Sequence, residues 1–103
     1  MDRDVVVAGR ARALAPRLRA LGDEHRLTIV LLLAQRARTV KELQEATGLS
    51  QTLASHHLKV LREQGMISAT ARGRSNVYSL CCDALSDPVR LLVELAANDR
   101  AAA

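Results

Sequence analysis

The chain has 103 residues, 49% of them hydrophobic, and its only aromatic residue is Tyr78. This length allows one domain with a modest core and excludes a second, catalytic domain, and a core of Leu, Val, Ile and Ala suits packed helices better than stacked sheets. The net charge of +4 is unevenly spread: residues 1–80 hold thirteen Lys and Arg against seven Asp and Glu, whereas residues 81–103 hold two against four. This positive charge permits a nucleic acid partner without requiring one.

The first predicted helix covers about residues 10–21. Leu14, Leu18 and Leu21 recur there at helical spacing, with arginines around them. Pro16 disturbs the pattern, because a proline inside a helix removes a hydrogen bond. We therefore expect the helix either to begin or to bend at this proline.

Two further helices are predicted from their end signals. Asp23 is a suitable N-cap for a second helix, whose apolar run 27–33 leaves almost no polar face, so this helix is expected to form the buried centre. Thr39 and Glu42 have the spacing of a capping box and predict a short third helix, which Gly48 ends.

A fourth helix and a hairpin follow. Ser50 is the predicted N-cap of a helix over about 51–64, so two helices are joined by a three-residue turn. Short β-compatible stretches at 67–72 and 76–80, separated by Gly73-Arg74-Ser75, predict a hairpin with a basic tip.

The chain is predicted to close with a last helix over about 87–98, capped by Asp87 and opened by Pro88. Residues 1–103 thus form a single α+β domain that is mostly α. No apolar run is long enough to span a bilayer, and the N-terminus lacks the basic start of a signal peptide, so we expect a cytoplasmic protein with no membrane partner.

The helix over 51–64 carries the strongest functional signal. Helical spacing places Ala54, Leu58 and Leu61 on one stripe, with Leu53, His57 and Val60 beside it. A polar opposite face is common to surface helices, but here it begins with short hydrogen-bonding side chains that can approach base edges, and a basic hairpin follows. The residues of this polar face are Gln51, Thr52, Ser55, His56, Lys59, Arg62 and Glu63.

Several segments resemble, in order and spacing, the ArsR/SmtB family of bacterial transcriptional regulators. They are ALGDEHRL at 20–27, LSQ at 49–51, SHHLKVL at 55–61, GMI at 65–67, RGR at 72–74 and VYSL at 77–80, and the similarity covers roughly residues 12–96. The resemblance implies a winged helix-turn-helix fold of five helices with a two-stranded wing. It also implies a homodimeric repressor whose first and last helices form the interface, with the helix-turn-helix at about 40–64 and the wing at about 67–80.

We assign DNA contacts on this basis. Base reading falls to Gln51, Thr52, Ser55 and His56, and phosphate or wing contacts fall to Lys59, Arg62, Arg72, Arg74 and Asn76. His57 is expected to pack or cap rather than meet DNA, since it lies beside the apolar stripe. Two such helices in a dimer would meet a near-palindromic site about 34 Å apart.

The signal that would regulate the protein is less defined. The segment 42–47, which holds metal-binding cysteines in many relatives, has none here, and residues 83–103 contain no histidine for the family's usual zinc-type site. Cys81 and Cys82 are the candidate sensor, binding a soft thiophilic ion or being oxidised, although two small apolar fillers are the more common role of such cysteines. A nickel or zinc site at His25 is the alternative, with Asp23, Glu24 or Asp87 as further ligands.

Catalysis has little support, because the chain has no glycine-rich phosphate loop, nucleophile elbow or paired metal-ligand spacing. We therefore expect a DNA-binding regulator and not an enzyme. The alternatives are a regulator without its own sensor, or a protein-interaction module, that takes its signal from a second regulatory protein.

Overall fold

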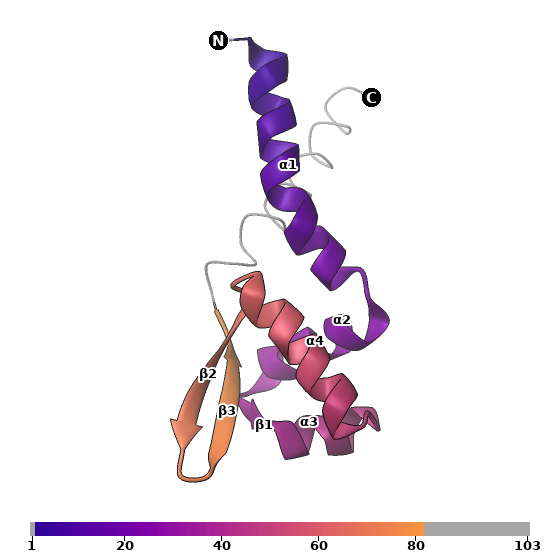
Figure 1. Cartoon of the computed structure of the whole chain (residues 1–103), viewed down its shortest axis with the longest axis vertical. Coiled ribbons are helices and arrows are strands. Elements are labelled where there is room, and N and C mark those ends of the chain that lie inside the picture. The colour runs from indigo at the N-terminus through magenta and orange to yellow at the C-terminus, as the bar shows by residue number, and fades with distance from the viewer. Residues whose placement is uncertain (1, 82–103) are drawn as a thin grey trace.

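The computed structural model describes residues 2–81 as a mostly helical body with one small antiparallel sheet (Figure 1). The predicted α+β class is confirmed. The predicted last helix, Cys82 and Asp87 lie outside the described residues. In chain order the elements are α1 (Arg3–Leu21), α2 (Glu24–Gln35), β1 (Arg38–Thr39), α3 (Val40–Thr47), α4 (Gln51–Glu63), β2 (Ile67–Arg72) and β3 (Ser75–Leu80).

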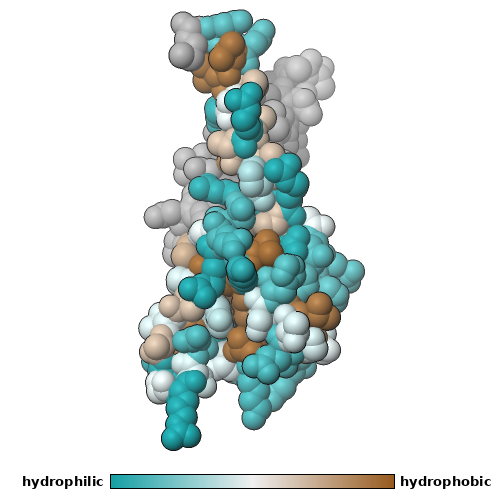
Figure 2. All heavy atoms as spheres, viewed as in Figure 1, coloured by the Kyte–Doolittle hydropathy of each residue, from teal (hydrophilic) through white to brown (hydrophobic). Residues whose placement is uncertain are grey.

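Helix α1 is longer than predicted and projects from the body (Figure 1). Asp2 caps it, its side chain accepting from the Asp4 N–H at 3.2 Å, so the start predicted near residue 10 is wrong. The helix also continues through Pro16, which cannot donate to the Arg12 carbonyl; Arg12 is exposed, so water can replace that donor. Ala20 is the only buried residue of α1, and Figure 2 shows apolar side chains at its free end, where Val5 to Val7 are exposed.

The core lies between α2, α3, α4 and the sheet. Helix α2 buries Ile29, Val30 and Leu33, but its Leu27 and Leu31 are 43% and 59% exposed. The expectation that α2 is buried on all sides is therefore wrong, since one flank of the helix faces solvent. The other buried residues of this core are Ala20, Leu43, Leu58, Leu61, Met66, Ile67 and Tyr78.

The sheet has three strands where two were predicted. β2 and β3 form the expected hairpin, and β1 adds to the other side of β3 through the pairs Arg38↔Tyr78 and Thr39↔Val77, giving the order β1-β3-β2. Because Thr39 is also the N-cap of α3, this short pairing fixes the start of α3 against the wing. Within residues 2–81, no helix is long and apolar enough to cross a membrane.

Candidate nucleic-acid interface

The turn between α3 and α4 sets the direction of the exposed helix. Gly48 adopts a left-handed conformation with φ of 75°, and its N–H donates to the Gln44 carbonyl at 2.8 Å, which closes α3. Two residues later the Ser50 hydroxyl accepts from the Leu53 N–H at 3.2 Å and caps α4. Both end signals predicted from the sequence are confirmed, and together they fix where α4 begins.

Helix α4 has one packed face and one open face. Ala54, Leu58 and Leu61 are at most 1% exposed, as the predicted stripe requires, whereas Leu53, predicted beside it, is 50% exposed. All the residues proposed from this helix for DNA contact are exposed: Gln51, Thr52, Ser55, His56, Lys59 and Arg62.

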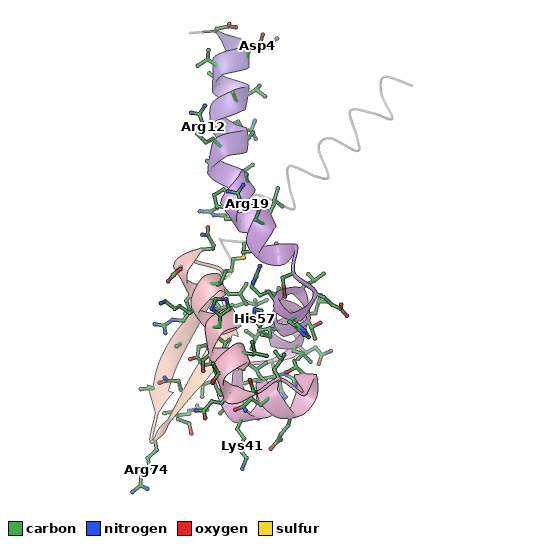
Figure 3. The ribbon with its side chains drawn as sticks, turned by 45° about the vertical axis from the view of Figure 1, so that its right-hand side comes forward. Asp4, Arg12, Arg19, Lys41, His57 and Arg74 are labelled. Atoms are coloured by element: carbon green, nitrogen blue, oxygen red, sulfur yellow. The ribbon has the colours of Figure 1, made fainter. Side chains whose placement is uncertain are left out.

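The wing is a tight hairpin whose tip carries a cation. The strands are joined through Gly73 and Arg74, with Arg72 paired to Ser75, so the loop is one residue shorter than predicted. Gly73 has φ of 63° and Arg74 does not have a positive φ, the pattern of a type II′ turn. Figure 3 shows the Arg74 side chain extending from the tip into solvent, and Arg72 and Asn76 are also exposed.

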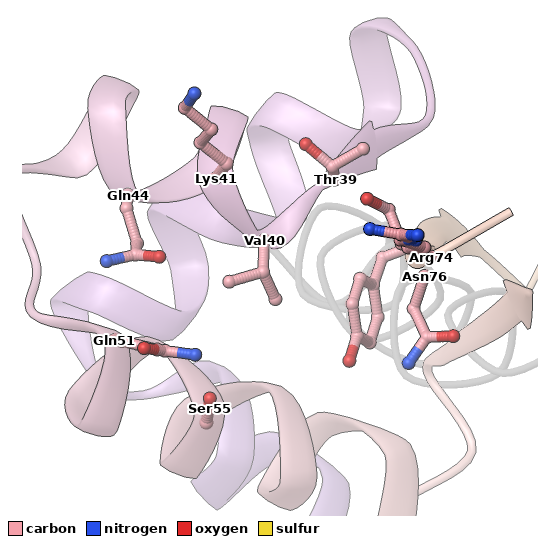
Figure 4. Close-up of a pocket in the computed structure, with 10 residues that line it drawn as sticks. Thr39, Val40, Lys41, Gln44, Gln51, Ser55, Arg74 and Asn76 are labelled. Carbon is pink, nitrogen blue, oxygen red and sulfur yellow. The ribbon is translucent and has the colours of Figure 1, made fainter. Parts of the chain in front are cut away.

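An open hollow of about 520 Å³ joins the wing to α4 (Figure 4). It brings Gln51 and Ser55 on one side together with Arg74 and Asn76 on the other, four residues that the sequence had assigned separately to the helix and the wing. Its full lining is Thr39, Val40, Lys41, Gln44, Gln51, Ser55, Arg74, Ser75, Asn76 and Tyr78.

The remaining predicted contacts lie elsewhere on the same helix. Lys59 and Arg62, with Glu63, line a second and smaller hollow of about 250 Å³ in the last turns of α4. Thr52 and His56 are exposed but line neither hollow. The structure thus groups Gln51 and Ser55 with the wing and keeps Lys59 and Arg62 apart from it.

Sequence reasoning missed Lys41 and Gln44 of α3. Both line the larger hollow, and Lys41 is exposed at its rim (Figure 4). A signal was present for Lys41, because Val40 and Leu43 predicted the packed side of α3 and helical spacing places Lys41 on the other side. Only the three-dimensional arrangement places that other side next to Gln51.

This surface carries positive charge with little internal neutralisation. Among residues 2–81, Lys41, Arg62, Arg72 and Arg74 form no ion pair, while Lys59 lies 4.0 Å from Glu63 with both side chains well exposed. An exposed pair of this kind contributes little to stability and leaves the lysine able to meet another anion. The charges and hydrogen-bonding groups therefore suit a polyanion that also presents donors and acceptors.

His57 is 7% exposed, whereas its neighbour His56 is exposed, so the prediction that His57 packs is confirmed. Its Nδ1 lies 3.4 Å from Nη1 of Arg26. Burial lowers the pKa of His57 below its usual value; the Asp23 carboxylate opposes this shift, and the charges of Arg26, His56 and His25 add to it. The imidazole is therefore held neutral near pH 7.

The predicted sensor residues are only partly described. Cys81 is half-buried just after β3, and its N–H donates to the Met66 carbonyl at 3.0 Å. No group of three or more His, Cys, Asp or Glu residues within 2–81 is placed to hold a metal ion, and this includes His25 with Asp23 and Glu24. The third carboxylate proposed for that site, Asp87, falls outside this range.

Comparison with known proteins identifies relatives of this chain. Residues 23–69 match the family profile described as "Bacterial regulatory protein, arsR family". The HTH-type transcriptional regulator NmtR of Mycobacterium tuberculosis is 41% identical over 70 residues, which are 68% of this chain and 58% of NmtR. The "Probable mercury resistance operon repressor" of Streptomyces lividans is 37% identical over 84 residues, or 82% of this chain and 67% of that protein.

Solved structures agree with these matches. Reduced HlyU from Vibrio cholerae N16961 superimposes with a TM-score of 0.74 at 27% identity, over 86% of this chain and 94% of HlyU. The sequence of HlyU from the same species is named as a transcriptional activator. The chain therefore has relatives named as repressor and as activator, and its match spans little more than half of the length of NmtR.

Proposed function

Because the chain belongs to the arsR family of bacterial regulatory proteins, we propose that it binds double-stranded DNA and regulates transcription, without a catalytic role. The observation that carries this proposal is the hollow in which Gln51 and Ser55 of α4 face Arg74 and Asn76 of the wing. A single face thereby offers hydrogen-bonding groups for base edges next to a cation for the phosphate backbone.

The recognition helix α4 would lie in the major groove with its first two turns against the bases. The residues proposed to read them are Gln51, Thr52, Ser55 and His56, all exposed and all short enough to approach closely. Phosphates would be held by Lys59, Arg62, Arg72 and Arg74, with Asn76 beside the wing tip.

We propose that the regulator is a homodimer joined by about residues 10–21 of its first helix and by a last helix near residues 87–98. Helix α1 supports this, because only Ala20 among its nineteen residues is buried. A two-fold dimer would place two copies of α4 in successive major grooves, about 34 Å apart, on a near-palindromic operator. Binding there would repress transcription, in the bacterial cytoplasm.

The proposed effector is a thiophilic metal ion or an oxidant acting on Cys81 and Cys82. Support comes from the position of Cys81 directly after the wing strand β3, where a change at the sulfur lies close to a DNA-contacting element. The Streptomyces lividans relative is named for mercury resistance, and mercury is a soft ion of the kind that cysteine thiolates bind, which supports a thiophilic metal as the effector.

A charge reversal on the reading face tests DNA binding. Ser55→Glu places a carboxylate in the hollow that is expected to face DNA, so fluorescence anisotropy with DNA from the protein's own promoter should show a loss of affinity on the order of a hundredfold. Ala8→Glu is the matched control, because it makes the same charge change at an exposed site of α1 outside the proposed dimer segment. Equal affinities for the two variants would refute this binding face.

A further inference from the structure

Three helices meet at one guanidinium group. Arg26, in the first turn of α2, donates from Nε to the Ala20 carbonyl at the end of α1 at 2.7 Å. Its Nη1 lies 3.4 Å from Nδ1 of His57 on α4, and Figure 3 shows His57 between α4 and α2. Arg26 therefore links the projecting helix to the helix that carries the reading face.

This link requires a neutral histidine. A guanidinium group has only donors, so Nδ1 of His57 must accept and the ring proton must sit on Nε2. A second proton on Nδ1 would remove the acceptor and place a positive charge 3.4 Å from Arg26. The ring is 7% exposed, so water can do little to screen that repulsion.

The charged and titratable groups around His57, within residues 2–81, favour the neutral state. From α2 come Arg26 and the ring of His25, whose centroid is 5.7 Å away, and from α4 comes His56 at 5.6 Å. Asp23 is the one opposing group, and its carboxylate is already engaged as the N-cap of α2, accepting from the N–H groups of His25 and Arg26 at 2.9 and 3.1 Å.

We propose that Arg26 and His57 are positioning residues that hold the recognition helix, and that protonation of His57 releases this contact and weakens DNA binding in acid. The inference rests on the proposed DNA binding. A displacement of His57 reaches the reading face directly, because Ser55 and His56 lie on the same turn of the same helix.

The expected pH dependence follows from the direction of the shift. The pKa of His57 is lowered in the folded protein, so the unfolded chain takes up the proton first as the pH falls. The contribution of this contact is complete above the ordinary histidine value of about 6.5 and is lost as the pH falls toward the folded value. DNA binding compares two folded states, so the dissociation constant for DNA should rise as the pH falls below the lowered pKa of folded His57, by up to about tenfold per pH unit for a single linked proton.

The test measures the affinity for the promoter fragment from pH 5.5 to 8.0 at constant ionic strength. Wild type should lose affinity toward acid. His57→Asn places an amide oxygen near the position of Nδ1, so it keeps an acceptor for Arg26 but cannot take up the proton, and its affinity should no longer fall toward acid. The matched control is His25→Gln, which removes an exposed neighbouring ring outside the proposed DNA contacts and should keep the acid loss.

NMR titration of the histidine rings in wild type gives a second readout that needs no variant to fold. The pKa of the His57 ring should lie below the ordinary histidine value of about 6.5, and the amide signals of Ala20 and Ser55 should shift with the same midpoint. The proposal is overturned if His57→Asn loses affinity in acid as wild type does, or if those amides do not follow the His57 ring. Failure of wild type to bind DNA at pH 8.0 would instead refute the proposed function, and the amide shifts would still decide whether the contact opens.

Discussion

Replacing Arg74 by alanine should change the salt dependence of DNA binding by a predictable amount. The side chain stands at the tip of the wing, exposed and without an ion pair among residues 2–81, so nothing in this part of the protein competes for its charge. Each phosphate contact contributes about 0.9 to the slope of log affinity against log salt. A dimer has two Arg74 side chains, so the slope should fall by about 1.8 in magnitude.

That slope change can be measured by anisotropy between 50 and 200 mM salt. Over this range the affinity of Arg74→Ala should decline about tenfold less than that of wild type. Arg3→Ala is the matched control, because it removes the same charge at the far end of α1, next to Asp4 (Figure 3). An unchanged slope for Arg74→Ala, or an equal change for Arg3→Ala, would refute the phosphate contact.

Three further predictions concern reading, folding and sensing. Gln51→Ala should reduce the preference for the operator over scrambled DNA by about 1–3 kcal/mol in competition binding, with little change in the salt slope; a uniform loss on both DNAs would contradict base reading. Thr39→Ala should lower the free energy of unfolding by about 1 kcal/mol in urea, because the capping box with Glu42 supports a helix of only eight residues. Mercuric ion should weaken DNA binding of wild type about 5- to 150-fold but leave a Cys81→Ser, Cys82→Ser double variant unaffected; equal responses would reduce the cysteines to packing residues.

The helix ends were readable in the sequence because their chemistry is local. Asp23, Thr39 and Ser50 each accept from backbone N–H groups two or three residues ahead, and Gly48 supplies the left-handed residue after α3. The start of α1 was predicted wrongly although its cap is also local. Val5 to Val7 have low helix propensity, and the Asp2 cap before them was overlooked.

Features that depend on distant parts of the chain could not be predicted. β1 has two residues, too few for an alternating pattern, and exists because Arg38 and Thr39 pair with Tyr78 and Val77. Lys41 joins the larger hollow only once this pairing fixes α3 against the wing. The exposure of Leu27 and Leu31 likewise depends on which flank of α2 its neighbours cover, which hydrophobicity alone cannot decide.

The DNA-binding proposal is tested most directly by footprinting the wild-type protein on its own promoter region. We predict two protected half-sites of related sequence whose centres are one helical turn apart, about 10 base pairs, or a multiple of that spacing. Protection should be lost for Ser55→Glu and retained for Ala8→Glu. Protection that is absent, that has no preferred sequence, or that survives in Ser55→Glu would contradict sequence-specific recognition by α4.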